Sequence, residues 1–311
     1  MAADLVFVVN PASDNGRTRR RWRSYERSFR RSLGSGFEVL MTQRPGHATE
    51  ITAAALLAGA RTVVSVGGDG TLNEVVNGFL DRTGRPWNPE ARIAVLPVGT
   101  GADFAKTVPS PQTADALVEM VKLGTHRTID AGVCEFLEGG VPRTRYFLNV
   151  AEFGSGGAVV DRVNRTTKVF GGRVSFLLAI LRTLPRYQNT RVTYEADGGA
   201  PKEAIVNDFV VANGRYFGAG LMPAPFADLS DGLLDIVIFG DIDFATARRN
   251  LPALRRGEHL GIDEVTSFRC REIVIRCAEE MIDLDGEFVG RHPLRFAVVP
   301  KAISLVTGKE R

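Results

Sequence analysis

The chain has 311 residues, of which 44% are hydrophobic and 24% charged, and its formal net charge is +3. This composition is typical of a soluble globular protein with two domains, and so small a net charge does not indicate a nucleic-acid-binding protein. Only three cysteines are present, which excludes a disulfide framework, and we expect reduced thiols in or near the core. No apolar run reaches the roughly 18 residues of a membrane-spanning helix, and the N-terminus lacks the features of a signal peptide, so we expect a cytoplasmic protein.

The first part of the chain alternates between strand and helix patterns. Apolar runs predict buried strands at 5–10, 37–42, 61–68 and 92–99. Helical periodicity follows them at 17–33, 47–59, 71–80 and 113–124. This alternation is typical of a parallel sheet covered by helices. We therefore expect an α/β class with a Rossmann-like nucleotide-binding domain over residues 1–128, completed by the C-terminal segment 296–311.

The remainder of the chain has a different pattern. Strand-like runs follow one another after residue 126, with glycine and proline turns between them. They predict a mostly antiparallel β-sandwich domain over residues 129–295. Two predicted helices interrupt it at 171–184 and 243–257, the second broken near Pro252. Because no Gly/Ser spacer separates the domains, we expect them to share a packed cleft.

The stretch SVGGDGTLNE at 65–74 joins a predicted strand to a predicted helix. Glycines let a ligand approach the backbone, and the N-terminus of a helix attracts phosphate. Thr71 and Glu74 have the spacing of a capping box at the start of that helix. The stretch matches neither a P-loop nor a dinucleotide-binding motif. Asp69 would repel a phosphate, so we expect it to serve Mg²⁺ or a proton chain beside a nucleotide, with a local helix cap as the structural alternative.

Two further loops of this kind follow predicted strands. LPVGTGADFAKT at 96–107 places Thr100 and Asp103 in a glycine-rich loop, and VVNPASDNGR at 8–17 contributes Asn10. The carboxyl ends of parallel strands meet at one edge of a sheet, where ligands bind in open α/β folds. Three such loops at one edge predict a nucleotide site.

These motifs resemble the diacylglycerol kinase catalytic domain family, which includes bacterial lipid kinases and the sphingosine and ceramide kinases. The resemblance spans nearly the whole chain and is carried by NPASDNG, GGDGTLNEVVNG, LPVGTGADFA, DGLLDI (231–236) and DGE (285–287). The GGDGT element is shared with NAD kinases and phosphofructokinases, whereas the last two elements point to the lipid-kinase branch. The resemblance implies an ATP- and Mg²⁺-dependent kinase of phospholipid biosynthesis that phosphorylates the hydroxyl of diacylglycerol or a related lipid alcohol.

The resemblance also implies catalytic and nucleotide-binding residues. Glu287 would be the general base that takes the proton of the lipid hydroxyl, with Asp285 beside it, and Asp69 would organise phosphates and Mg²⁺. Asp69 and Glu287 would meet across the interdomain crevice around the triphosphate. The ATP site would be lined by Asn10, Thr42, Gly67, Gly68, Asp69, Gly70, Thr71, Asn73, Glu74, Gly99, Thr100 and Asp103. For DGE taken alone, a hairpin turn is the structural alternative.

A structural Mg²⁺ site is the third implication of the resemblance. Asp231 and the backbone carbonyls of Leu233 and Asp228 would hold the ion, and Asp130 would reach it through water. A turn that enters a strand is the alternative for this loop. One departure from the family is Ala102, where relatives usually carry asparagine. A catalytically idle nucleotide- or lipid-binding regulator is therefore a further hypothesis, and the shared GGDG turn keeps an NAD kinase-like soluble kinase as another.

Residues 17–31 contain eight arginines in fifteen positions. This pattern fits either the solvated face of a surface helix or docking on an anionic membrane, which a lipid kinase needs because its substrate stays in the bilayer. No stacking pattern or binding module supports nucleic acid as the partner. We therefore expect a lipid substrate at the membrane surface and peripheral membrane association, with a homodimer left open.

Overall fold

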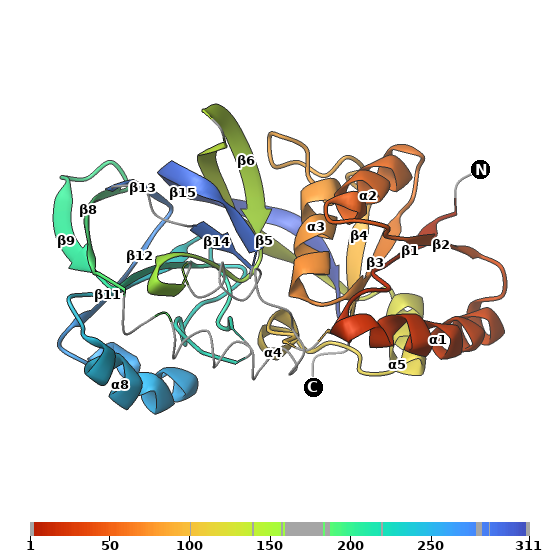
Figure 1. Cartoon of the computed structure of the whole chain (residues 1–311). Helices are drawn as coiled ribbons and strands as arrows, with labels where there is room; N and C mark the ends of the chain where they lie inside the picture. The colour runs from red at the N-terminus through yellow and green to blue at the C-terminus, as the bar shows by residue number, and fades with distance from the viewer. Residues whose placement is uncertain are drawn as a thin grey trace. The chain divides into compact units, whose positions relative to one another are not determined.

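The computed structural model describes residues 3–99, 101–138, 140–156, 158, 183, 187–218, 220–277, 282–285 and 287–308, with the backbone alone over 287–293. The chain divides into two compact units (Figure 1). The first consists of Met1–Ile129 with Lys301–Arg311, and the second of Asp130–Pro300. The predicted ATP-site residue Thr100 and the predicted helix at 171–184, apart from residue 183, lie outside the described residues.

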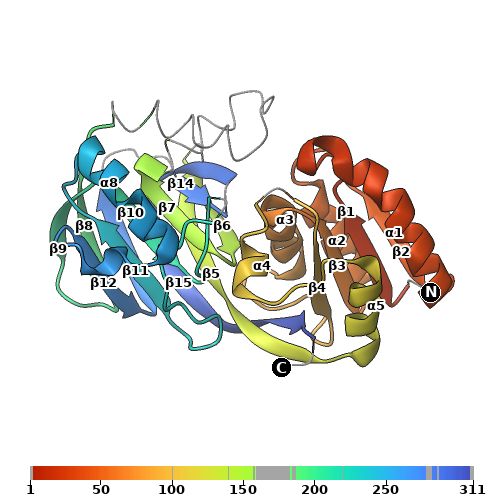
Figure 2. The same cartoon turned by 90° about the horizontal axis from the view of Figure 1, so that it is seen from below.

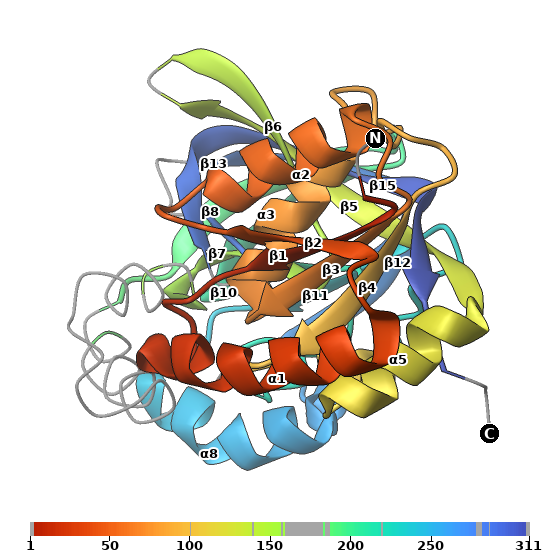
Figure 3. The same ribbon diagram turned by 90° about the vertical axis from the view of Figure 1, so that its right-hand side faces the viewer.

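The first unit is a parallel sheet with helices on both faces. Its strands are β1 (Leu5–Val9), β2 (Phe37–Met41), β3 (Thr62–Gly67), β4 (Arg92–Pro97) and the last part of β15 (Glu287–Val306). Its helices are η1 (Asp14–Gly16), α1 (Arg17–Leu33), α2 (His47–Leu57), α3 (Asp69–Phe79), α4 (Phe104–Thr107) and α5 (Ala114–Leu123). The strands are parallel in the order β15–β4–β3–β1–β2, with α2 and α3 on one face and α1 and α5 on the other (Figure 3). The predicted Rossmann-like arrangement is confirmed.

Burial on both faces explains why the central strands are apolar along their length. Strand β1 is buried at every position, as the coverage of a parallel sheet by helices requires. Helix α1 packs through the one apolar stripe of an otherwise basic sequence. Its Trp22 and Phe29 rings lie 5.6 Å and 4.6 Å from the ring of Phe7, centroid to centroid. The arginines of α1 therefore lie on the solvent side.

The predicted capping box at the start of α3 is wrong. Helix α3 begins two residues earlier than predicted, so Thr71 lies inside its first turn, where its hydroxyl accepts a hydrogen bond from Asn10 Nδ2 (3.0 Å). The carboxylate of Glu74 instead accepts the backbone N–H groups of Gly46 and Ala48, both at 2.9 Å. Glu74 thus satisfies free donors at the N-terminus of α2, where negative charge is favourable.

The second unit is a sandwich of two β-sheets. Its strands, besides the first part of β15, are β5 (His126–Glu138), β6 (Val141–Phe147), β7 (Val150–Gly154), β8 (Thr190–Ala196), β9 (Lys202–Val206), β10 (Asp208–Ala212), β11 (Leu234–Phe239), β12 (Val265–Cys270), β13 (Glu272–Cys277) and β14 (Ile282–Leu284). One sheet has the order β12–β11–β10–β7–β14–β15, and the other the order β9–β8–β13–β15–β5–β6. Figure 2 labels these strands apart from β13. The strand pairs of these two sheets whose registers are described are antiparallel, which confirms the predicted antiparallel β-sandwich.

The core of the sandwich consists of aromatic and β-branched side chains from both sheets. Phe153 and Phe209 stack within it at a centroid distance of 5.1 Å. Cys134 and Cys270 are buried in the same core and Cys277 is half-buried, all three as free thiols. The prediction of reduced cysteines in or near the core is confirmed.

Helix α8 (Phe244–Arg256) runs through its proline without interruption. The predicted break near Pro252 is therefore wrong. A proline removes one N–H from the helical ladder, and the helix continues because the bonds before and after it remain. Its first turn is fixed by Asp243, whose carboxylate accepts the N–H of Thr246 (2.8 Å). None of the helices in the described part of the chain is long and apolar enough to cross a bilayer.

Strand β15 continues through Pro300, although the sequence pattern there indicates two separate runs. Its pairing with β13 ends at Ala297, and its pairing with β4 is at Leu305. Pro300 falls between these two ladders, so its missing N–H removes no hydrogen bond from either of them. A proline can therefore stand inside this long strand.

Candidate functional site

Three loops meet at the carboxyl ends of β1, β3 and β4 in the first unit. Asn10 follows β1, and its backbone N–H donates to the carbonyl of Val66 in β3 (3.0 Å). Its side-chain Nδ2 donates to the hydroxyl of Thr71 in α3 (3.0 Å). Asn10 thereby ties the first loop to the GGDG loop, as the shared sheet edge predicts.

The glycines of these loops allow a close approach of one backbone to another. A Cβ atom on Gly99 would lie 2.4 Å from the Cα of Gly68, a distance that real Cβ contacts do not reach. A Cβ atom on Gly67 would lie 2.3 Å from the hydroxyl oxygen of Thr71. Glycine is therefore required at Gly67 and Gly99 for the loops to pack, independently of any ligand.

The carboxylate of Asp69 connects the second loop to the third. Its Oδ2 accepts the N–H of Asp103 (3.0 Å), and its Oδ1 accepts the N–H of Phe104 (3.1 Å). Asp69 therefore caps α4, not the helix in which it stands. The N-cap of α3 is Gly68, a residue that has no side chain with which to cap the helix. Its first-turn N–H groups have the orientation and partial charge that suit a phosphate.

The other predicted nucleotide-binding residues occupy different positions around this edge. Thr42 follows β2, and its N–H donates to the carbonyl of Val9 (2.9 Å). Gly70 lies in the first turn of α3, whereas Asn73 is buried one turn later and accepts from the amide of Asn77. Asp103 is buried and forms an ion pair with Lys106. Glu74 is engaged at α2, so its contribution is to position the helices.

Ala102 adopts a left-handed conformation in the loop after β4, with a φ of +49°. This region costs an L-residue with a Cβ roughly 1–2 kcal/mol, and asparagine tolerates it better than alanine. The position where relatives usually carry asparagine is therefore a strained position in this chain.

We expect Ala102→Gly to raise the free energy of unfolding by roughly 0.5–1 kcal/mol, because glycine adopts this conformation without strain. Ala102→Asn should raise it by less. Urea unfolding followed by circular dichroism measures both changes. Ala54→Gly, at an exposed position of α2, is the matched control and should lower stability by about 1 kcal/mol. A loss of stability in Ala102→Gly would contradict the strain.

Asp285 lies in the turn between β14 and β15, in the second unit, with a φ of +53°. Its Oδ2 accepts the N–H of Leu148 (2.9 Å), and its Oδ1 accepts those of Asn149 (2.9 Å) and Val150 (3.1 Å). The carboxylate thus holds the segment that enters β7. The backbone of Glu287 pairs with Leu284 across the same hairpin, so the DGE motif does form a turn. The side chain of Glu287 lies outside the described residues.

A chain of hydrogen bonds leads from this segment to Asp130. The amide of Asn213 donates to the carbonyls of Leu148 (2.8 Å) and Asp130 (3.3 Å). The carboxylate of Asp130 accepts the N–H of Gly232 (2.8 Å), and its own N–H donates to the carbonyl of Leu229 (2.6 Å). The structure therefore brings Asp130 to the DGLLD loop, as the resemblance implies. Asn213 was not predicted, although an asparagine directly after an apolar strand was a readable signal.

The DGLLD loop shows how its carboxylates are used. Asp228 Oδ1 accepts the N–H (3.0 Å) and hydroxyl (3.2 Å) of Ser230, and Asp231 Oδ1 accepts the N–H of Leu233 (3.0 Å). The other oxygen of Asp231 lies 3.8 Å from the guanidinium of Arg269. Within the described residues, no group of three His, Cys, Asp or Glu side chains could hold a metal. A divalent cation at Asp231 would face a positive neighbour, so this donor set does not fit a structural Mg²⁺.

Glu152 is a buried acid that sequence reading missed, because it stands inside an apolar strand. Its exposed fraction is 1%, and neither carboxylate oxygen has a hydrogen-bond partner among the described residues. Asp283 lies directly opposite on β14, and Asp208 is close by on β10. Burial, and then the charges of Asp208 and Asp283, raise the pKa of Glu152 well above its usual range.

A Rossmann-like unit with a GGDG loop, followed by a β-sandwich, defines a kinase fold shared with NAD kinases and diacylglycerol kinases. Residues 4–134 match the diacylglycerol kinase catalytic domain, and residues 149–307 match the YegS C-terminal NAD kinase beta sandwich-like domain. The crystal structure of a diacylglycerol kinase from Bacillus anthracis superposes with a TM-score of 0.69 at 18% identity, covering 99% of this chain and 97% of that one. Yeast NADH kinase superposes with a TM-score of 0.56 at 11% identity, covering 98% and 83%.

Curated relatives agree with these matches. The diacylglycerol kinase of Mycobacterium tuberculosis is 31% identical over 263 residues, which is 83% of this chain and 81% of that protein. The diacylglycerol kinase of Bacillus subtilis is 29% identical over 267 residues, which is 86% and 84% of the two chains. The chain belongs to the diacylglycerol kinase family, and it is an enzyme of the lipid kinase class.

Proposed function

We propose that this enzyme transfers the γ-phosphate of ATP to the hydroxyl of diacylglycerol or a related lipid alcohol. The observation that carries the proposal is the coincidence of two facts about the first unit. Its sequence matches the diacylglycerol kinase catalytic domain, and its three conspicuous loops converge at one sheet edge. Loops of this kind at a sheet edge are where open α/β folds bind nucleotides.

The nucleotide would bind with its phosphates at the N-terminus of α3. There the partial positive charge of the helix favours an anion. When bound, Mg²⁺ neutralises developing charge on the phosphates, and hard cations prefer oxygen ligands. The carboxylates of Asp69 and Asp103 are the oxygen donors of this edge. Asp69 also fixes the third loop, so it would hold the site in shape before any nucleotide arrives.

Glu287 would take the proton from the lipid hydroxyl as general base. A carboxylate does this when it lies within hydrogen-bond reach of the hydroxyl. Asp285 would act as a positioning residue, since its carboxylate accepts three backbone N–H groups and fixes the turn that carries Glu287. That Glu287 meets Asp69 across an interdomain crevice stays a prediction.

The proposal is tested with radiolabelled ATP and Mg²⁺, offered with mixed micelles of diacylglycerol, sphingosine or ceramide, and with NAD in solution. We expect label in a lipid phosphate and none in NADP. Label in NADP alone would establish an NAD kinase, and ATP binding without any labelled product would establish a catalytically idle regulator. Glu287→Gln should abolish turnover, whereas Glu264→Gln, an exposed glutamate, should not. Full turnover in Glu287→Gln would refute its role as the base.

We further propose that α1 docks the enzyme on an anionic membrane surface. The helix carries eight arginines and a single acidic residue, Glu26, and all eight arginines are exposed. Arg17 and Arg21 pair with Asp14, and Arg30 pairs with Glu26. Arginines at Arg19, Arg20, Arg23 and Arg31 form no ion pair with any described residue. Charge that is not neutralised within the protein remains available to lipid head groups.

We expect the triple variant Arg19→Gln, Arg20→Gln, Arg23→Gln to bind vesicles of anionic phospholipid at least tenfold more weakly. Each basic residue near such a surface contributes about 1 kcal/mol. Vesicle sedimentation at low and high salt measures the effect, which salt should reduce. Arg248, Arg249 and Arg255 on α8 are also exposed, so their replacement by glutamine is a control with the same change of net charge. Equal weakening in both triple variants would show that location on α1 is irrelevant.

A further inference from the structure

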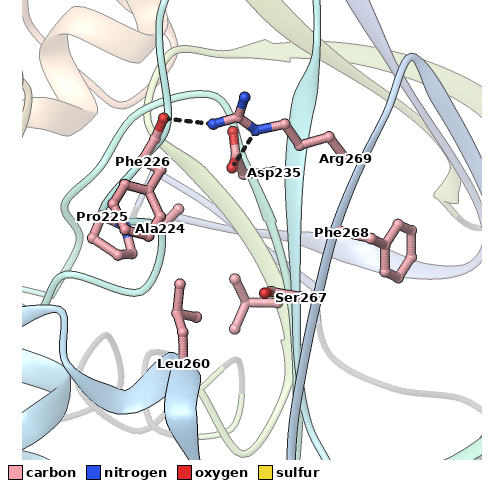
Figure 4. A pocket seen from close by; sticks show the side chains of 9 residues that line it. Ala224, Pro225, Phe226, Asp235, Leu260, Ser267, Phe268 and Arg269 are labelled. Atoms are coloured by element: carbon pink, nitrogen blue, oxygen red, sulfur yellow. Dashed lines mark hydrogen bonds and ion pairs between the residues drawn. The ribbon is translucent and has the colours of Figure 1, made fainter.

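The guanidinium of Arg269 connects β12 to three other places in the second unit, and Figure 4 draws two of these connections. Its Nε donates to Asp235 Oδ1 on β11 (3.1 Å), directly opposite in the strand register. Its Nη2 donates to the carbonyl of Phe226 (3.0 Å), and its Nη1 lies 3.8 Å from Asp231 Oδ2. One side chain therefore links the strand pair to both ends of the loop 226–231.

Asp235 and Asp231 are less exposed than Arg269, so the guanidinium offsets part of the cost of burying their negative charges. The side chains of Asp235 and Asp231 are 13% and 24% exposed, against 44% for Arg269. Burial raises the pKa of Asp235, and the hydrogen bond and charge of Arg269 act in the opposite direction. The hydrogen bond with Asp235 and its charge raise the pKa of Arg269. The guanidinium stays charged at any physiological pH and cannot be titrated away.

Arg269 also forms one wall of a small pocket of about 260 Å³. The rest of the pocket is largely apolar, with Ala224, Pro225, Val237 and Leu260 among its lining residues. Nε and Nη2 of the guanidinium point to Asp235 and Phe226 in Figure 4, so these two nitrogens already donate within the protein. The pocket therefore gives no indication of an anion site, and the contacts indicate that Arg269 stabilises the loop.

We propose that Arg269 is the fixed cation of this loop, and that the loop keeps its conformation without a structural Mg²⁺. The chain supplies, as a side chain, the positive charge that the resemblance assigns to an ion. Gly232, which directly follows the loop 226–231, donates its N–H to Asp130, so Arg269 acts as a positioning residue for the hydrogen-bond chain that leads to Asp285. The inference does not depend on which lipid or nucleotide the enzyme uses.

The test compares thermal unfolding of the full chain in EDTA with unfolding in millimolar Mg²⁺, both without nucleotide. We expect the wild-type melting temperature to be the same in both. Arg269→Gln should melt roughly 4–8 °C lower in EDTA, and Mg²⁺ should restore part of this loss because the carboxylates then lack a cation. Arg269→Lys should lie in between, since it keeps the charge and loses the fork of donors. Arg276 on β13 forms an exposed ion pair with Glu195, so Arg276→Gln is the matched control and should have little effect on the melting temperature.

Hydrogen exchange of the peptide 224–235 locates the effect. Exchange should be slow in wild-type protein with EDTA and faster in Arg269→Gln. Adding Asp231→Asn to Arg269→Gln should remove the rescue by Mg²⁺. The proposal is overturned if EDTA lowers the wild-type melting temperature and Asp231→Asn abolishes that response, because the loop would then hold a metal. An unchanged melting temperature in Arg269→Gln would overturn it as well.

Discussion

Replacing Asp69 by asparagine is expected to lower lipid-kinase turnover by a factor of about 10²–10³, the range seen when a pre-organised electrostatic group is removed. The carboxylate accepts two backbone N–H groups, from Asp103 and Phe104. An asparagine amide has one acceptor oxygen, so its NH₂ group would face one of these donors. The third loop would move away from the GGDG loop, and the negative charge beside the phosphates would be lost.

Two measurements separate these contributions in Asp69→Asn. Titration with ADP, with and without Mg²⁺, shows whether the loss depends on the metal or on the shape of the loop. A loss of affinity in both conditions would indicate the loop, whereas a loss confined to Mg²⁺-containing buffer would indicate the charge. Asp4→Asn, at an exposed position of the same unit, is the matched control and should retain full turnover. Unchanged turnover in a folded Asp69→Asn variant would show that Asp69 has no role in catalysis.

The first unit could be predicted well because its signals are local. Four strands of the first unit are short apolar runs, and the parallel arrangement follows from their alternation with helices. The role of Glu74 could not be predicted in the same way. Its spacing from Thr71 fits a capping box, but its partners, Gly46 and Ala48, precede it by more than 25 residues. A local motif cannot reveal that a side chain caps another helix.

The second unit shows the same limit more strongly. Its strands could be predicted, yet the contacts of Asp285 with Leu148 and Val150 span about 135 residues of sequence. The DGE motif was readable as a turn, and the turn is present. The order of strands in the sheet decides which backbone N–H groups the carboxylate in such a turn can accept. The periodicity of the sequence does not encode that order. Glu152 was missed for a related reason, since one acid within VAEFG does not disturb the apolar pattern of a strand.

Glu152→Gln is expected to stabilise the protein at pH 8 by roughly 2 kcal/mol. At this pH the wild-type protein must either bury a charged carboxylate or keep it protonated above its ordinary pKa, and both cost free energy. The pKa of Glu152 is raised in the folded state, by burial first and then by Asp208 and Asp283. The folded state therefore binds this proton more tightly than the unfolded state does. The contribution to stability is complete below the ordinary carboxyl pKa and is lost as the pH rises toward the folded value. Glutamine does not titrate, so its variant lacks this component.

Urea unfolding between about pH 5 and pH 9, above the ordinary carboxyl pKa, measures the free energy of unfolding of Glu152→Gln and of the wild type. The difference in the free energy of unfolding should widen as the pH rises, since only the wild type has a buried carboxyl group that titrates. Glu203→Gln on β9 removes an exposed glutamate and should leave the pH dependence unchanged. A difference that stays constant with pH would mean that Glu152 is charged throughout, and a cation would then have to lie beside it. In that case Glu152→Gln would be destabilising.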